Sequence, residues 1–175
     1  MDEEGVLARI RDDEALRYAL DLVGDFDVSR LDPVEELRLP DGSRPTPVAG
    51  CAAGGTYYLC GPIGTRRPVL YASSEGQATL LAADLAEALA VITALASWQD
   101  ALGGHPLDEL EEEARADHPG LDRERERIRA ALGLPALAPE EARERLLAAA
   151  RRTVPGFLPV PVEHDGYYDP MPVGG

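Results

Sequence analysis

The amino-acid sequence predicts an α+β fold. An antiparallel β-sheet, built as a meander, is flanked by an N-terminal helix and a long central helix, and a charged helical extension follows. Residues 3–23 and 80–102 have helical apolar periodicity, whereas residues 34–71 consist of short runs bounded by glycine and proline. Such runs are typical of antiparallel strands joined by tight turns. Beyond residue 102 the helical patterns return, but they are rich in charge.

The N-terminal helix is predicted from one apolar stripe. Leu16, Ala19, Leu20 and Val23 follow the i, i+3, i+4, i+7 spacing that places side chains on a single helix face. The segment GDFDVSRLDP then ends the pattern. The expected central helix carries a similar stripe, made of Leu81, Leu85, Leu89, Ile92 and Ala96. A flanking apolar row within residues 91–102 makes this surface wide enough to cover a sheet.

The meander is expected in the runs VEELRL, PVAGCA, GGTYYLCG and RPVLYAS, with the turn signal PDGSRP after the first run. Side chains alternate between the two faces of a strand. In TYYLC this alternation places Thr56, Tyr58 and Cys60 on one face, and Tyr57 and Leu59 on the other. The double glycine before this run permits a tight entry into the strand.

Three regions are expected along the chain. Residues 1–102 form the α+β domain, and GGHP at 103–106 marks its end. Residues 103–152 form the charged helical extension, in which Pro139 suits a first helical turn. Its apolar stripes are thin, so we expect these helices to pack on the first domain and not to form a core of their own. Residues 153–175 form a proline-rich, extended tail.

The charge balance narrows the class of partner. The chain has 32 acidic and 17 basic side chains, a net charge of −15, and every basic residue is arginine. This balance argues against nonspecific binding to nucleic acid or to an anionic membrane, and it favours either a solvated acidic surface that confers solubility or a basic partner. No apolar run approaches the roughly 20 residues that a membrane-spanning helix needs. The N-terminus is acidic, unlike a secretory leader, so we expect a cytoplasmic protein.

The two cysteines, Cys51 and Cys60, flank the double glycine and admit three readings. A zinc site needs about four ligands, commonly with cysteines paired at short spacing, and no second pair is present. A disulfide is geometrically conceivable, but a reducing compartment opposes it. Free cysteine is commonly a small buried side chain, and we expect that role here. Two loops contain glycines, GCAAGG and GPIGTRRP. Neither has the spacing or the lysine of a phosphate-binding loop, so no cofactor is expected.

The turn YASSEG at residues 71–76 supports an alternative, a small serine-dependent hydrolase. Ala72–Gly76 differs from the G-x-S-x-G nucleophile motif by alanine in the first glycine position, and Ser74 would be the nucleophile. His164 and Asp165 could supply a base. Against this reading, the preceding strands form hairpins without intervening helices, and no helix starts directly after the serine.

The order of these patterns resembles the SUKH superfamily, which includes the yeast cell-wall-assembly regulator. The resemblance rests on GGTYYL at residues 54–59, PVLYASSEG at 68–76 and ADLAEAL at 83–89, and it covers about residues 1–102. The strands lack the tryptophan common in that family, since the single tryptophan is Trp98. The resemblance implies an α+β fold and a non-enzymatic role in protein–protein interaction. Many bacterial members look like immunity proteins that neutralise a toxin, often a nuclease.

A nuclease shaped for phosphate is basic, so an acidic protein would be steered towards it. We expect the partner to meet acidic residues near the turns of the sheet, namely Glu35, Asp41 and Glu75. Glu35 and Glu36 are expected on opposite faces. Tyr57 or Tyr58 is the expected apolar anchor, because aromatic side chains are enriched in binding hot spots.

Overall fold

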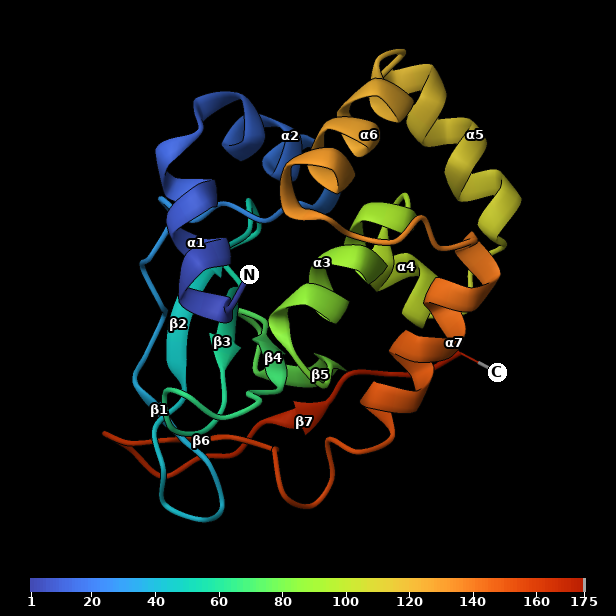
Figure 1. Cartoon of the computed structure of the whole chain (residues 1–175). Coiled ribbons are helices and arrows are strands. Elements are labelled where there is room, and N and C mark those ends of the chain that lie inside the picture. The colour runs from blue at the N-terminus through green and yellow to red at the C-terminus, as the bar shows by residue number, and fades with distance from the viewer. Residues whose placement is uncertain (175) are drawn as a thin grey trace.

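The computed structural model describes residues 1–174 and has the predicted α+β class (Figure 1). Residue 175, the end of the expected tail, lies outside the described residues. The helices are α1 Glu3–Asp12, α2 Glu14–Gly24, α3 Leu85–Ala94, α4 Trp98–Leu102, α5 Leu107–Asp117, α6 Leu121–Leu132 and α7 Pro139–Ala150. The strands are β1 Leu37–Arg38, β2 Thr46–Gly50, β3 Thr56–Leu59, β4 Val69–Ala72, β5 Gln77–Ala82, β6 Val160–Pro161 and β7 Asp169–Pro170.

The main sheet has the strand order β2-β3-β4-β5-β7. Its first four strands pair antiparallel in sequence order, so a meander is present, but the run VEELRL lies outside it and the unpredicted strand β5 completes it. The fifth strand comes from the tail: β7 lies parallel to β5, and Asp169 N donates to the carbonyl of Gly76 at 2.9 Å. A second tail strand, β6, pairs with β1. The sheet is therefore mixed, and the tail is an integral part of the fold.

The expected N-terminal helix is two helices. Asp13 lies between them in an extended conformation, and its carboxylate accepts the backbone N–H of Leu16 at 3.0 Å. A side-chain acceptor of this kind begins a new helix because it satisfies an otherwise free amide. The predicted stripe is nevertheless buried, with Leu16 and Leu20 fully enclosed.

The expected central helix over residues 80–102 is wrong at its start and is broken in its interior, whereas its end at Leu102 is confirmed. Leu81 belongs to β5, and α3 begins only after Asp84, whose carboxylate accepts the N–H of Glu87 at 2.8 Å. Leu95 is extended, and this separates α3 from the short α4. A continuous apolar run such as QATLLA does not distinguish a buried strand from a helix by periodicity alone.

The two faces of the sheet are buried by different parts of the chain. Tyr57 and Leu59 pack with α1, α2 and α3, whereas Tyr58 and Cys60 pack with the tail and the end of α7. The alternation predicted for TYYLC is therefore confirmed. Figure 1 shows α1 and α3 on one side of the strands and the tail on the other.

The charged helices share the core of the preceding domain, as their thin stripes predicted. α6 packs on α2, and α7 packs on β5 and α3 (Figure 1). Ile128 of α6 and Leu146 of α7 are fully buried in the same apolar cluster as the first helices. Pro139 occupies the first position of α7, as predicted. The core therefore continues across residues 103–106.

Candidate functional site

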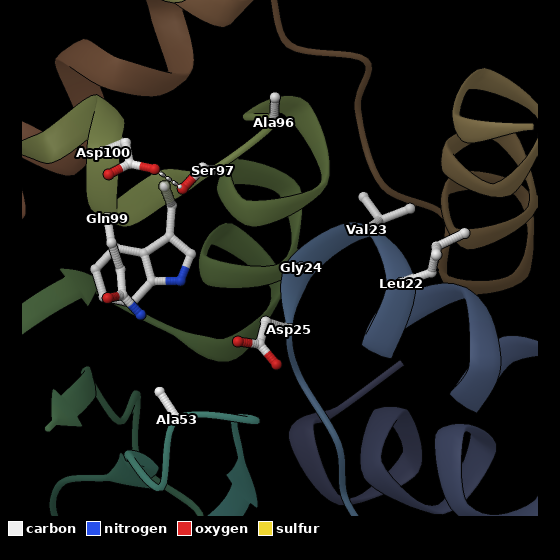
Figure 2. Close-up of a pocket in the computed structure, with 10 residues that line it drawn as sticks. Leu22, Val23, Gly24, Asp25, Ala53, Ala96, Ser97, Gln99 and Asp100 are labelled. Carbon is white, nitrogen blue, oxygen red and sulfur yellow. Dashed lines mark hydrogen bonds between the residues drawn. The ribbon is translucent and has the colours of Figure 1, made fainter. Parts of the chain in front are cut away.

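A notch opens at the end of the sheet where β3 begins (Figure 2). Three segments that are distant in sequence surround it: the last turn of α2, the loop before β3, and the junction of α3 and α4. The notch has a volume of about 270 Å³. Its lining consists of Leu22, Val23, Gly24, Asp25, Ala53, Ala96, Ser97, Trp98, Gln99 and Asp100.

Hydrogen bonds between buried aromatic side chains fix one wall of the notch. Trp98 Nε1 donates to the hydroxyl of Tyr57 at 3.0 Å, and that hydroxyl donates to the carbonyl of Asp25 at 3.2 Å. Burial raises the pKa of Tyr57, so its hydroxyl stays protonated and remains a donor. Gln99 Nε2 donates to the hydroxyl of Tyr71 at 3.4 Å, and Tyr71 packs edge-on against Trp98 with ring centroids 4.9 Å apart.

The double glycine gives this wall its shape. Gly54 has φ +91°, a conformation that favours glycine. A Cβ on Gly55 would collide with the hydroxyl and ring of Tyr71. The tight entry predicted from GGTYYLCG is therefore present, and it allows a tyrosine of the neighbouring strand to lie directly against the backbone.

The charge around the notch is negative. Asp25 ends α2, and Asp100 lies in α4 with its carboxylate turned toward Ser97 (Figure 2). Neither forms an ion pair within residues 1–174. α2 has no basic residue in its last turn, so the negative end of its dipole is uncompensated. Burial raises the pKa of Asp21 one turn earlier, and the carboxylates of Asp27 and Asp25 add to this rise.

A second concave site, the groove, lies on the other face of the sheet, and its volume is about 400 Å³. Its lining consists of Pro33, Glu35, Glu36, Leu37, Arg44, Pro45, Pro47, Tyr58 and Glu163. Two of its acidic side chains already have partners inside the protein. Arg44 pairs with Glu36. Glu35 accepts from the hydroxyl of Tyr168 at 3.2 Å and lies 2.8 Å from His164 Nε2.

The structure separates the residues predicted to meet a partner. Tyr57 is fully buried and Tyr58 is 4% exposed, so neither can serve as the expected surface anchor. The prediction placed them on opposite faces correctly, but both faces of this sheet are covered. Glu35 is partly buried and holds the tail.

Asp41 and Glu75 are exposed, as predicted. Ser43 donates through its hydroxyl and its amide to the Asp41 carboxylate, and these bonds lower the pKa of Asp41. Asp41 precedes the start of β2, whereas Glu75 lies in the β4–β5 turn at the opposite end of the strands. Glu75 is therefore at the notch end of the sheet, and Asp41 is not.

The cysteines are buried, unbridged side chains on opposite faces of the sheet. Cys51 lies 3.3 Å from the hydroxyl of Tyr71, next to the notch wall. Burial raises the pKa of Cys60 to about 12, which keeps its thiol protonated at neutral pH. No disulfide can join two side chains that the sheet separates. Within residues 1–174, histidine, cysteine and acidic side chains form no group of three that could hold a metal ion.

The YASSEG turn connects strands β4 and β5. Ser74 is exposed, and its hydroxyl donates to the carbonyl of Ala53 at 3.1 Å. His164, the histidine proposed as its base, lies in the tail and is hydrogen-bonded to Glu35. These contacts bring no base to Ser74 within the described part of the chain.

Comparison of the chain with known protein families, with curated proteins and with solved structures gives no match. The site is therefore argued from its own chemistry. Within residues 1–174, no helix is both long and apolar enough to cross a bilayer.

Sequence reasoning missed the acidic residues of the notch, Asp25 and Asp100, and assigned Trp98 and Gln99 only to a helix. A weak signal existed for Asp25. The tripeptide GDF directly after an apolar helical stripe is typical of a helix end, because aspartate tolerates the left-handed conformation that Asp25 adopts at φ 49°. No local pattern pairs this residue with Asp100.

Proposed function

We propose that this chain is a non-enzymatic, acidic protein-binding module of the cytoplasm, and that its partner is a basic protein. In its most specific form, the proposal is an immunity-type protein that neutralises a nuclease-like toxin. The SUKH-like order of a helical start, a meander and a covering helix supports this form, since that resemblance implies a role in protein–protein interaction.

The observation that carries the proposal is the uneven use of charge. Within residues 1–174, eleven of the seventeen arginines form an ion pair with a carboxylate. Twelve carboxylates pair with arginine and one with His164, so nineteen of the thirty-two acidic side chains have no ion pair. The carboxylates without an ion pair therefore outnumber the six remaining arginines, and the protein keeps an excess of negative charge. Such an excess raises the association rate of a basic partner and repels acidic competitors.

The experiment is capture of partners from native lysate with the tagged chain as bait, at low and at high salt. We expect a basic protein that is retained at low salt and released at high salt, because screening shortens the reach of surface charge. If the captured protein is encoded beside this chain and stops growth when expressed alone, co-expression of this chain should restore growth.

A matched bait separates this interaction from nonspecific capture of basic proteins. Substituting Asp41→Asn and Glu75→Gln removes two exposed charges, and neither side chain contacts the core. The specific partner should then elute at lower salt. Retention of only neutral or acidic proteins, with no dependence on salt, would argue against a basic partner.

A further inference from the structure

We propose that the notch receives one arginine side chain of the partner protein. This inference rests on the proposed function, because it names the contact through which a basic partner is held once it has been attracted. The charge, the free hydrogen-bond acceptors, the size and the rigidity of the notch each favour such a side chain.

Charge complementarity favours a cation. The last turn of α2 faces the notch, and its backbone carbonyl end carries roughly half a negative charge. Asp25 and Asp100 add two carboxylates without an ion pair inside residues 1–174. No arginine lines the notch; the nearest arginine to this end of α2 in sequence, Arg30, pairs with Asp27 at 3.8 Å.

The carboxylates of Asp25 and Asp100 also keep hydrogen-bond acceptors for a cation. One oxygen of Asp25 accepts the amide of Ala52 at 2.9 Å, and one oxygen of Asp100 accepts the hydroxyl of Ser97 at 2.8 Å. These bonds orient both carboxylates. Within the described residues the second oxygen of each carboxylate accepts no hydrogen bond. Each free oxygen remains available to accept a donor from a cationic side chain.

Arginine fits these acceptors better than lysine. Its guanidinium is planar, presents five donors in a rigid fork and packs against aromatic rings, whereas the ammonium of lysine is a compact, strongly hydrated charge. The ring of Trp98 lines the notch, while its N–H is occupied by Tyr57. At 4% exposure this ring is a buried wall of the notch, so the preference for arginine rests on the five donors of its fork.

The size of the notch limits the ligand to about one side chain. Pockets for organic ligands have volumes of about 300–1,000 Å³, and the notch, at about 270 Å³, is smaller. Its wall is already held by the bonds among Tyr57, Trp98, Tyr71 and Gln99. A wall fixed before binding lowers the entropy lost on binding.

The chain offers a specific reporter, since Trp98 is its only tryptophan. The indole N–H of Trp98 gives one NMR resonance, and it can be followed while the full chain is titrated with Nα-acetyl-arginine amide at constant ionic strength. The neutral isostere Nα-acetyl-citrulline amide is the matched probe. We expect a saturable shift with the arginine probe and none with the citrulline probe.

Isosteric variants locate the binding. Asp25→Asn and Asp100→Asn keep the oxygens that accept from Ala52 and Ser97, and asparagine also tolerates the left-handed conformation of residue 25. Each substitution should lower the affinity for the arginine probe several-fold. Asp41→Asn, at the other end of the sheet, should leave this affinity unchanged. An absent shift, an equal shift with citrulline, or an equal effect of Asp41→Asn would overturn the proposal.

The captured partner separates this inference from the proposed function. If the notch is the contact, Asp25→Asn with Asp100→Asn should increase the dissociation rate of the partner by at least ten-fold. A partner that still binds with an unchanged dissociation rate would refute the notch contact and leave the acidic-module proposal standing. A chain that captures no basic partner but still binds the arginine probe would refute the proposed function alone.

Discussion

At the residue scale, Gly55 shows how one missing side chain organises the wall of the notch. The hydroxyl of Tyr71 occupies the place of a Cβ, and from there it contacts Cys51 and Gln99. The sequence predicted the tight entry at this glycine because adjacent glycines before an aromatic strand permit few other readings. It could not predict that Tyr71, which lies sixteen positions later, fills the space.

We expect Gly55→Ala to lower the free energy of unfolding by about 1–3 kcal/mol, because the added methyl must displace a buried tyrosine. Gly156→Ala is the matched control, since a Cβ there meets nothing within 4 Å and the site is exposed. Urea denaturation of both variants measures the difference. Equal stability of the two variants would contradict the close approach to Tyr71.

His164 gives a pH-dependent prediction. The backbone carbonyl of Asp165 raises the pKa of His164, and the Glu35 carboxylate adds to the rise. A raised folded-state pKa means that protonation favours the folded state. The contribution is therefore complete below the ordinary imidazole pKa of about 6.5 and is lost as the pH rises through the raised value.

Consequently, His164→Gln should lower Tm more at mildly acidic pH than at mildly alkaline pH. Thermal denaturation at both pH values measures this difference. His118→Gln, at an exposed histidine between α5 and α6, serves as the control and should show no such trend. A larger effect of His164→Gln on the alkaline side would contradict the sign of this linkage.

At the element scale, a buried ion pair joins the charged helices α5 and α6, and its arginine also donates to α3 of the preceding domain. Arg125 of α6 donates to both oxygens of Glu111 in α5, at 2.6 and 2.8 Å, and to the last carbonyl of α3, at Ala94. Its side chain is 5% exposed, and its Nε has no partner within residues 1–174. Three helices therefore meet at one arginine.

Removing Arg125 leaves the buried carboxylate of Glu111 with only one partner, the half-exposed Arg115 at 3.3 Å. Arg125→Met should lower the free energy of unfolding by about 3 kcal/mol, and adding Glu111→Leu should restore most of this loss. Arg145→Met breaks a more exposed pair with Glu141 and should cost at most about 1 kcal/mol. Chemical denaturation gives all three values, and a similar loss in both single variants would refute the role of Arg125 in joining these helices.

The elements also show where sequence patterns are ambiguous. The strands at residues 46–72 were predictable because glycine and proline bound them. β5 was not, because QATLLA is buried on both faces and shows no alternation. The break at Asp13 was missed because the helical apolar periodicity continues across this residue, although aspartate is a favoured residue directly before a helix.

At the scale of the whole molecule, the sequence predicted the fold class and the charge but not the notch. Fold class follows from local periodicity, and net charge follows from composition. The notch depends on three segments around residues 22–25, 53 and 96–100, which only the tertiary packing brings together. The predicted tyrosine anchors failed for the same reason, because the tail and α7 cover Tyr58 and the helices α1–α3 cover Tyr57.

The central claim is that unpaired surface carboxylates bring a basic partner to this chain. The most direct measurement is the association rate of the captured partner at low and high salt, for the wild type and for the Asp41→Asn/Glu75→Gln variant. The account predicts that salt lowers the wild-type rate, and that the variant associates more slowly at low salt and depends less on salt. An association rate that neither salt nor these substitutions change would contradict it.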